Sequence, residues 1–217
     1  MITQVQLIDA PGEGRAGNPE FYYDRGVSRY RYRDSGQFVS REAMLNLTRG
    51  RINSVQREMD RSVDDLVAGR INFRQFQIDN IERVKLLHSQ QLLLGRGGVA
   101  NTKSEDWLWL ARELKQNQYP YFHRFMQDIK KGNLSEAQVR ERLKMYARTS
   151  RRSYGEGRRA SYKDSGMNWE RRLLGSCRHC PDCLGYSRQG WQPIGQLPLP
   201  AQNCRCLGNC CCSMEYK

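Results

Sequence analysis

The sequence predicts a mainly α-helical protein: a helical bundle with an extended N-terminal arm and a small Cys-rich C-terminal subdomain that includes a short β-hairpin. Three observations lead to this fold class. Apolar residues recur at helical spacing between residues 40 and 166, the first 39 residues keep no regular period, and all eight cysteines follow residue 176. We therefore expect an arm over residues 1–39, a helical domain over 40–166 and a Cys-rich subdomain over 167–217.

The predicted arm is rich in Gly, Tyr and Arg, a composition that favours neither a helix nor a buried strand over its whole length. Aromatic and basic residues alternate within it, so this part forms either a short strand or a segment that becomes ordered against a partner surface. A solvated linker is the third interpretation. The residues expected to contact a partner are Tyr30, Arg31, Tyr32 and Arg33.

Two long amphipathic helices are expected next. Ser40 is a suitable N-cap for the first, and Gly69 is a suitable stop. The second begins after Asn72 and ends in the Gly-rich stretch 95–98. Their apolar faces are expected to form the core, and the residues of the first face are Ile52, Val55, Met59, Val63 and Leu66.

A third helix begins near Ser104, and Pro120 is expected to break or kink it before the apolar pattern resumes as far as Ile129. Ser135 and Gln138 form a capping box, which predicts the start of a fourth helix. The bundle is therefore expected to contain about four helical elements.

Positive charge is concentrated in the second half of the chain. The formal net charge is +13, and residues 139–173 hold eleven Lys and Arg against four acidic residues. Such a stretch with tyrosines among the cations favours contact with nucleic acid or another polyanion. A solvated helix face is the alternative. The candidate nucleic-acid-binding residues are Arg148, Arg151, Arg152, Arg158, Arg159 and Lys163.

No membrane partner is expected. The apolar runs are far shorter than the ~20 residues that a membrane-spanning helix needs, and the start of the chain lacks the basic and apolar regions of a signal peptide. We expect the chain to be made in a reducing cytoplasm.

Motifs for catalysis are weak. The Gly-rich stretch 95–98 lacks the Gly-Lys-Ser/Thr ending of a phosphate-binding loop, and Asp64 and Asp65 are adjacent, which places them on different faces of a helix. His88 and His123 are expected to be ordinary structural residues. The sequence therefore predicts a protein that is not an enzyme.

The cysteines are the strongest local signal. Cys180 and Cys183 form a Cys-x-x-Cys turn, and 20 residues separate it from the cluster at 204–212, a spacing typical of zinc ribbons. Because all the main candidates are thiols, structural zinc is favoured over catalytic zinc. Several alternatives stay open: a ligand role for His179, a two-zinc cluster, an iron–sulfur cluster and structural disulfides.

The C-terminal half resembles the head morphogenesis, or minor head protein, family of tailed phages and prophages. The matching positions are Ala147-Arg148-Thr149, Trp169, Cys180, Cys183, Gly190-Trp191, Pro198 to Pro200, Cys206, Asn209, Cys210 and Cys212. The resemblance covers residues 135–217, and it implies that the metal ligands come from Cys180, Cys183, Cys206, Cys210 and Cys212. Cys177, Cys204 and Cys211 lie outside the shared pattern.

Membership of this family implies a low-copy structural protein of the virion, assembled in the host cytoplasm and located in the phage head near the portal. Its implied partners are the portal protein, the major capsid protein or other virion proteins, and packaged double-stranded DNA, with several copies around the portal. It would aid head assembly or the packaging and delivery of the genome. The alternative hypothesis is a zinc-dependent, nucleic-acid-binding regulatory protein.

Overall fold

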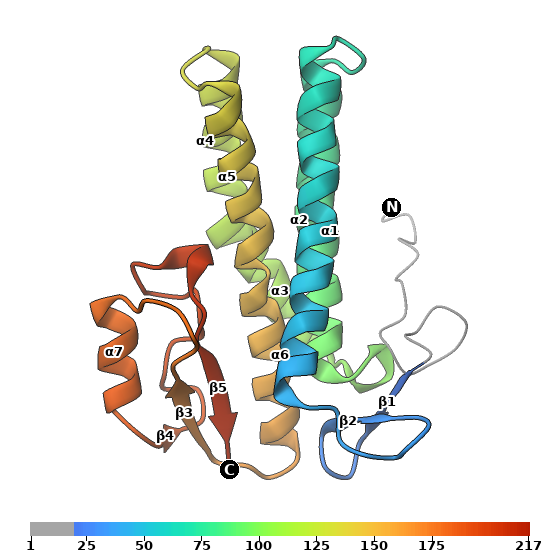
Figure 1. Ribbon diagram of the computed structural model, residues 1–217, viewed down its shortest axis with the longest axis vertical. Helices are drawn as coiled ribbons and strands as arrows, with labels where there is room; N and C mark the ends of the chain where they lie inside the picture. The colour runs from blue at the N-terminus through green and yellow to red at the C-terminus, as the bar shows by residue number, and fades with distance from the viewer. Residues whose placement is uncertain (1–19) are drawn as a thin grey trace.

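The computed structural model describes residues 20–217, and it confirms a mainly α-helical fold with short antiparallel strands and a Cys-rich C-terminal cluster. Helices α1 (Arg41–Val67) and α2 (Phe73–Arg96) form a long hairpin, which lies beside α4 (Tyr119–Lys130) and α5 (Glu136–Thr149) (Figure 1). Helix α6 (Arg151–Asp164) continues from α5 toward the end of the bundle where the strands lie. No helix in the described part of the chain has the length and apolar character needed to cross a membrane.

The predicted caps of the long helices are present. The Ser40 side chain accepts a hydrogen bond from the Ala43 amide, and the Asn72 side chain accepts one from the Gln75 amide. Gly97 ends α2 in a left-handed conformation. The faces of α1, α2, α4 and α5 that point at one another form the main core, whose buried residues include Ile52, Met59, Val63, Phe76, Val84, Leu87, Phe122, Phe125, Met126, Val139 and Leu143.

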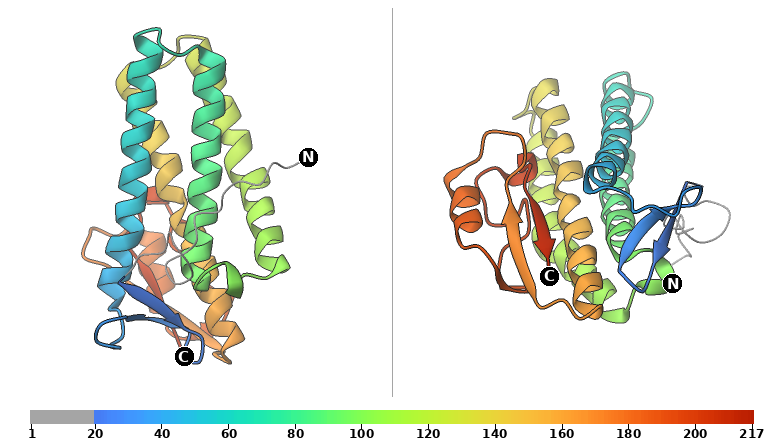
Figure 2. Two further views of the ribbon diagram at one scale, coloured as in Figure 1. Left: turned by 90° about the vertical axis from the view of Figure 1, so that its right-hand side faces the viewer. Right: turned by 60° about the horizontal axis from the view of Figure 1, so that its bottom comes forward.

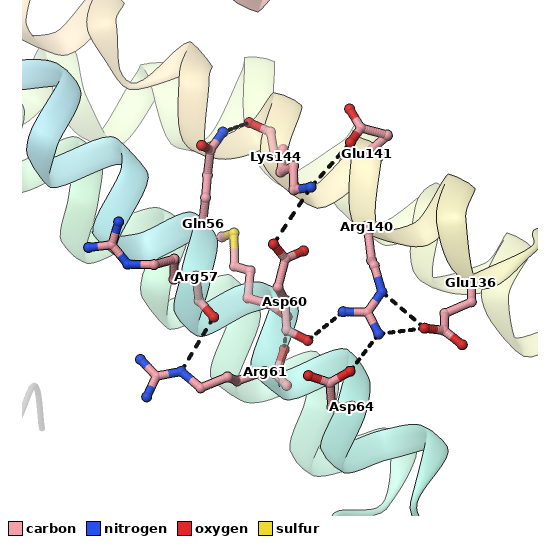
Figure 3. Close-up of polar contacts among 11 residues, drawn as sticks. Gln56, Arg57, Asp60, Arg61, Asp64, Glu136, Arg140, Glu141 and Lys144 are labelled. Carbon is pink, nitrogen blue, oxygen red and sulfur yellow. Dashed lines mark hydrogen bonds and ion pairs between the residues drawn. The ribbon is translucent and has the colours of Figure 1, made fainter.

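Polar contacts also join α1 to α5 along the bundle (Figure 3). Arg140 of α5 donates hydrogen bonds to the backbone oxygen of Asp60 (2.9 Å) and to the carboxylate of Asp64 (2.6 Å). One turn further along α5, the Lys144 ammonium lies 3.6 Å from the Asp60 carboxylate, and the Lys144 backbone oxygen accepts a hydrogen bond from Gln56. These two cations of the basic stretch therefore serve contacts within the bundle.

The predicted interruption at Pro120 is a change of helix type. Helix α3 (Ser104–Glu113) passes into η2 (Leu114–Gln118), a π-helical segment, and α4 follows with Pro120 in its first turn. Proline is tolerated there because amides of the first turn have no partner inside the helix. The chain bends without leaving a helical path.

Helix α6 packs against α2 through glycines. A β-carbon on Gly157 would lie 2.4 Å from the Leu92 backbone oxygen, and one on Gly95 would lie 2.3 Å from that of Tyr154. Only glycine permits such a close approach of two helix backbones. The sequence gives little sign of this contact because α6 carries no apolar stripe.

In the described part of the predicted arm, residues 20–39, the structure has the short-strand alternative for the alternating aromatic and basic residues. Strands β1 (Phe21–Asp24) and β2 (Arg29–Tyr32) form an antiparallel hairpin that pairs Phe21 with Tyr32 and Tyr23 with Tyr30. The hairpin packs on α1, α2 and α6 because one of its faces is aromatic. Residues 1–19 of the predicted arm lie outside the described residues.

The C-terminal subdomain is a small sheet with one helix beside it (Figure 2). Strand β3 (Trp169–Leu173) lies between β4 (Gln192–Pro193) and β5 (Ser213–Tyr216), and both pairings are antiparallel. Helix α7 (Pro181–Arg188) and the 3₁₀ turn η3 (Leu207–Asn209) complete it, and the short 3₁₀ turn η1 (Val99–Asn101) lies between α2 and α3. The short antiparallel strands expected in this subdomain are thus present, and they form a three-stranded sheet.

Candidate metal centre

Four thiols meet in the C-terminal subdomain. The sulfur atoms of Cys183, Cys204, Cys206 and Cys210 all lie within 4.8 Å of one another. The Cys183 sulfur is 3.6 Å from that of Cys206 and 3.7 Å from that of Cys210. Since Zn–S bonds are about 2.3 Å long, sulfur atoms at the corners of a zinc tetrahedron are about 3.8 Å apart. The group therefore has the size and the donor chemistry to hold one metal ion.

Local structure brings these thiols together. Cys180 caps α7 and Pro181 starts it, which places Cys183 in the first turn with its side chain buried. The 3₁₀ turn η3 reverses the chain between Cys206 and Cys210. The Asp182 carboxylate accepts a hydrogen bond from the Arg205 amide (2.8 Å) and thereby ties the loop of the second cluster to α7.

The backbone around Cys204 and Cys206 is bent sharply. Ala201, Asn203 and Leu207 have φ values of 69°, 48° and 47°, in the left-handed region. This conformation costs a non-glycine residue roughly 1–2 kcal/mol. A metal ion held by the thiols of this loop would offset that cost.

The structure brings three of the five predicted ligands, Cys183, Cys206 and Cys210, into the four-thiol group. The fourth is Cys204, which the family pattern left out. Its signal in the sequence is the Cys-x-Cys spacing with Cys206, which offers a second pair of thiols from one short loop. Cys180 and Cys212 lie beside this group rather than in it.

The thiols affect one another's protonation. Burial raises the pKa of Cys204 to about 11 and raises that of Cys183 further. A hydrogen bond from Cys212 lowers the pKa of Cys210 to about 4. The thiolate form is thus favoured at Cys210 and disfavoured at Cys183 and Cys204, because burial penalises the charged form and the negative charge of Cys210 repels a second one. A bound divalent cation would remove that repulsion.

A second group of ligand atoms lies next to the first. The side chains of Cys177, His179 and Cys211 hold their ligand atoms within 4.8 Å of one another, and a disulfide joins Cys177 to Cys211. The family pattern left out both of these cysteines, whereas His179 was an open alternative. The structure therefore uses all the cysteines in or beside two neighbouring groups.

The predicted nucleic-acid-binding arginines mostly turn inward. Arg148 donates to the side-chain oxygen of Asn209 (2.9 Å), and Arg151 donates to the backbone oxygen of Cys210. Arg152 forms an ion pair with the buried Glu113 (2.9 Å). These contacts join α5 and α6 to the rest of the chain, so the charges of these three predicted nucleic-acid-binding residues are used within the protein.

The other members of that set behave similarly, except for one. Arg159 forms an ion pair with the fully buried Glu170 of β3 (2.9 Å). Arg158 is packed among the rings of Tyr154, Tyr162 and Tyr216. Lys163 is exposed. The described structure therefore leaves one of the six predicted residues fully available to a polyanion.

The predicted partner-binding residues are part of the docked hairpin. Tyr30 is 6% exposed, and its hydroxyl donates to the backbone oxygen of Leu94 (3.0 Å). Tyr30 is therefore a core residue and not a partner contact, because its side chain is buried against Leu94 and Tyr154. Arg31 pairs with Asp24 (2.7 Å), the Tyr32 ring packs on Phe21, and Arg33 lies over Tyr22.

Comparison of the chain with protein-family models, with curated proteins and with solved structures finds no match. The phage-head assignment therefore remains a prediction from the residues of the C-terminal half.

Proposed function

We propose that the chain is a structural protein of a phage head, a minor capsid or head morphogenesis protein located near the portal vertex, and not an enzyme. The observation that carries the proposal is the four-thiol group at the end of a helical body. A closed thiol group of this kind supports a structural role, in which a bound metal ion stabilises the fold of the C-terminal subdomain. The residues that resemble the minor head proteins lie in and around this group, including Cys183, Cys206 and Cys210.

The metal that fits this group best is zinc. Four thiolates form a soft, closed donor set with no position left for water, which is typical of structural zinc and unlike catalytic zinc. Cys183, Cys204, Cys206 and Cys210 would hold the ion. The ion would supply a crosslink between α7 and the loop 204–210, in a subdomain too small to form a large apolar core.

The proposed partners are the portal protein, the major capsid protein or other virion proteins, and packaged double-stranded DNA, with several copies around the portal. The protein would aid head assembly or genome packaging and delivery, and would be assembled in the host cytoplasm. Exposed apolar side chains on the bundle, among them Leu108 (62% exposed) and Tyr121 (55% exposed), are candidate contacts with a partner.

Mass spectrometry of purified phage particles, together with copurification with the portal protein of the same phage, tests this proposal. We expect the chain in the particles at low copy number and bound to the portal. The Cys206→Ser/Cys210→Ser double variant should lose portal binding, and Cys180→Ser, which lies beside the four-thiol group, should keep it. Absence from particles and failure to bind portal or capsid protein would rule the proposal out.

The net charge of +13 favours a second candidate, a zinc-dependent nucleic-acid-binding regulatory protein. This function predicts a preferred DNA sequence and binding that weakens steeply with salt. A selection from random duplexes that yields no preferred site would exclude it. Uniform, weak binding is instead the behaviour expected of a basic virion protein near packaged DNA.

A further inference from the structure

His179 is held in one orientation with one ring nitrogen facing sulfur. Its Nε2 lies 2.8 Å from the backbone oxygen of Gly175. Because a carbonyl oxygen only accepts hydrogen bonds, Nε2 carries a proton, which leaves Nδ1 as the ring nitrogen that can bind a metal ion. Nδ1 lies 3.7 Å from the Cys212 sulfur and 3.9 Å from the Cys211 sulfur.

This arrangement is that of a metal-binding histidine. A ligating imidazole almost always donates its other ring N–H to a carbonyl or carboxylate, which fixes the tautomer and the ring direction. With Zn–N and Zn–S bonds of about 2.0 and 2.3 Å, the nitrogen and sulfur corners of one tetrahedron are about 3.5 Å apart. The two distances from Nδ1 to sulfur exceed this value by a few tenths of an ångström.

We propose that the reduced chain holds a second metal ion, with Cys177, His179, Cys211 and Cys212 as ligands. The ligand atoms of the first three lie within 4.8 Å of one another, and Cys212 is the further sulfur next to His179. One imidazole and three thiolates suit zinc or a similar divalent ion. This inference goes beyond the proposed function, because it concerns a second ion and holds whatever the protein's partners are.

The chain is built to bring these residues together. A β-carbon on Gly175 would lie 2.3 Å from the backbone oxygen of Cys211, so only glycine lets the two segments approach. Cys210 belongs to the four-thiol group and Cys211 to the second group. Cys212 is hydrogen-bonded to Cys210 and faces His179, so it lies between the two groups. The segment 210–212 would therefore serve both ions.

In the structure the sulfurs of Cys177 and Cys211 form a disulfide with each other. Cysteine binds a metal ion as the thiolate, so the second site forms only when this disulfide is reduced. A phosphine reductant breaks the S–S bond and leaves two thiols, while the phosphine takes an oxygen from water and becomes its oxide. Binding of the divalent ion then releases the thiol protons.

Native mass spectrometry of the full chain, kept in a phosphine reductant and loaded with Zn²⁺, tests the proposal. We expect two zinc ions per chain. His179→Ala should hold one, and His123→Ala, which changes an exposed histidine of α4, should hold two. Cys204→Ser should keep the second ion and lose the first, so the two sites are distinguished.

Cobalt substitution gives an independent readout of the ligands. The charge-transfer absorption of Co²⁺ grows with the number of thiolates, and its ligand-field bands report the nitrogen ligand. His179→Ala should therefore remove one set of bands and leave the spectrum of a four-thiolate site. Circular dichroism on each variant checks that the helices are retained.

One zinc ion in the reduced wild-type chain, or two in both the wild type and His179→Ala, would overturn the proposal. A single ion that is lost in Cys204→Ser and kept in His179→Ala would leave the four-thiol site intact and show that the reduced side chains of the second group bind no zinc. A reduced chain that binds no zinc would overturn both metal sites.

Discussion

At the scale of the residue, a single carbonyl oxygen connects the basic helix to the thiols. Arg151 of α6 donates to the backbone oxygen of Cys210, the residue whose thiol belongs to the four-thiol group and whose neighbours in sequence face His179. Arginine suits this contact because its guanidinium stays charged and presents several donors in a fixed plane. An arginine predicted from its charge to contact DNA thus helps to position the four-thiol group.

Replacing one thiol tests which cysteines bind metal. Loss of a side chain that hydrogen-bonds to a metal ligand typically costs about 10- to 100-fold in metal affinity. Cys204→Ser removes a direct ligand of the first site, so it should lower the zinc affinity by more than this. Competition with a chromophoric chelator measures the change. Cys180→Ser is the matched control and should bind zinc with near wild-type affinity. Equal losses in the two variants would contradict the assigned ligand set.

The buried His88 predicts how stability depends on pH. Burial, with Arg152 nearby, lowers the pKa of His88 to about 3, while the unfolded chain titrates near pH 6.5. The unfolded state therefore binds more protons between pH 3 and 6.5, so stability is fully present above pH 6.5 and falls with pH below it.

Between pH 6.5 and pH 5 this residue should remove about 2 kcal/mol from the free energy of unfolding. Urea denaturation of the wild type and of His88→Asn at both pH values measures it. The variant should lose less stability than the wild type over the same interval. Equal losses would show that His88 is not held neutral in the fold.

At the scale of the element, α6 packs closely against α2 because glycines at the contact have no side chains. Its contact with α2 depends on Gly157 and Gly95, where any side chain would meet backbone atoms of the other helix. Ser153 of α6 lies 2.8 Å from the His88 ring of α2, and the Ser161 hydroxyl donates to the Gly95 oxygen (3.3 Å). Small residues and short polar contacts take the place of interlocking apolar side chains.

Gly157→Ala should therefore destabilise the protein although alanine is the better helix former. The added methyl would lie 2.4 Å from the Leu92 oxygen, and overpacking of this kind costs about 1–3 kcal/mol. The control is Gly50→Ala in α1, where a methyl meets nothing within 4 Å and should stabilise by up to about 1 kcal/mol. Thermal unfolding of both variants gives the comparison. A stabilised Gly157→Ala would refute the close approach.

At the scale of the whole molecule, one buried ion pair, between Arg159 and Glu170, joins the helical body to the C-terminal sheet. Glu170 of β3 is fully buried, and it accepts from Arg159 of α6 and from the amides of Gly195 and Leu197. Arg172, also of β3, is 1% exposed and donates to the Pro198 oxygen. Arg159 thus connects α6 to the interior of the C-terminal subdomain.

Arg159→Ala should weaken the packing of the C-terminal sheet on α6. It leaves the Glu170 carboxylate buried without its cation, a change that typically costs about 3–5 kcal/mol. We expect the midpoint of urea unfolding to fall and proteolysis within residues 169–217 to be faster. Mass spectrometry of the fragments identifies the cleavage sites. Lys163→Ala removes an exposed cation of the same helix and should change neither. Equal behaviour of the two variants would argue against this connection.

The starts of the helices were predictable from the sequence, because N-capping depends on one residue and its near neighbours in the chain. Ser40, Asn72 and Ser135 cap helices through hydrogen bonds that need no tertiary contact, so their pattern is visible in the sequence. The docking of α6 was not visible, because it rests on the absence of side chains at Gly95 and Gly157.

The candidate metal centre was predictable in its location and less so in its membership. Cys183 is identified by its Cys-x-x-Cys turn, whereas Cys204 joins because residues 201–207 fold back sharply. The sequence shows that Arg151 and Arg159 are charged, but it does not show where their side chains point. Their orientation depends on acceptors that lie 59 and 11 residues away in the sequence. Long-range partners of this kind are settled only by the assembled fold.

The pairing of β3 with β5 has a consequence for synthesis on the ribosome. Strand β3 ends at Leu173 and β5 begins at Ser213, so the sheet cannot close until the intervening residues have been translated. Helices α1 to α5 make their contacts earlier, since domains fold progressively from the N-terminal side. Metal capture would then be the last folding event, and a chain that stalls before residue 204 would carry a finished bundle with its Cys-x-x-Cys turn still open.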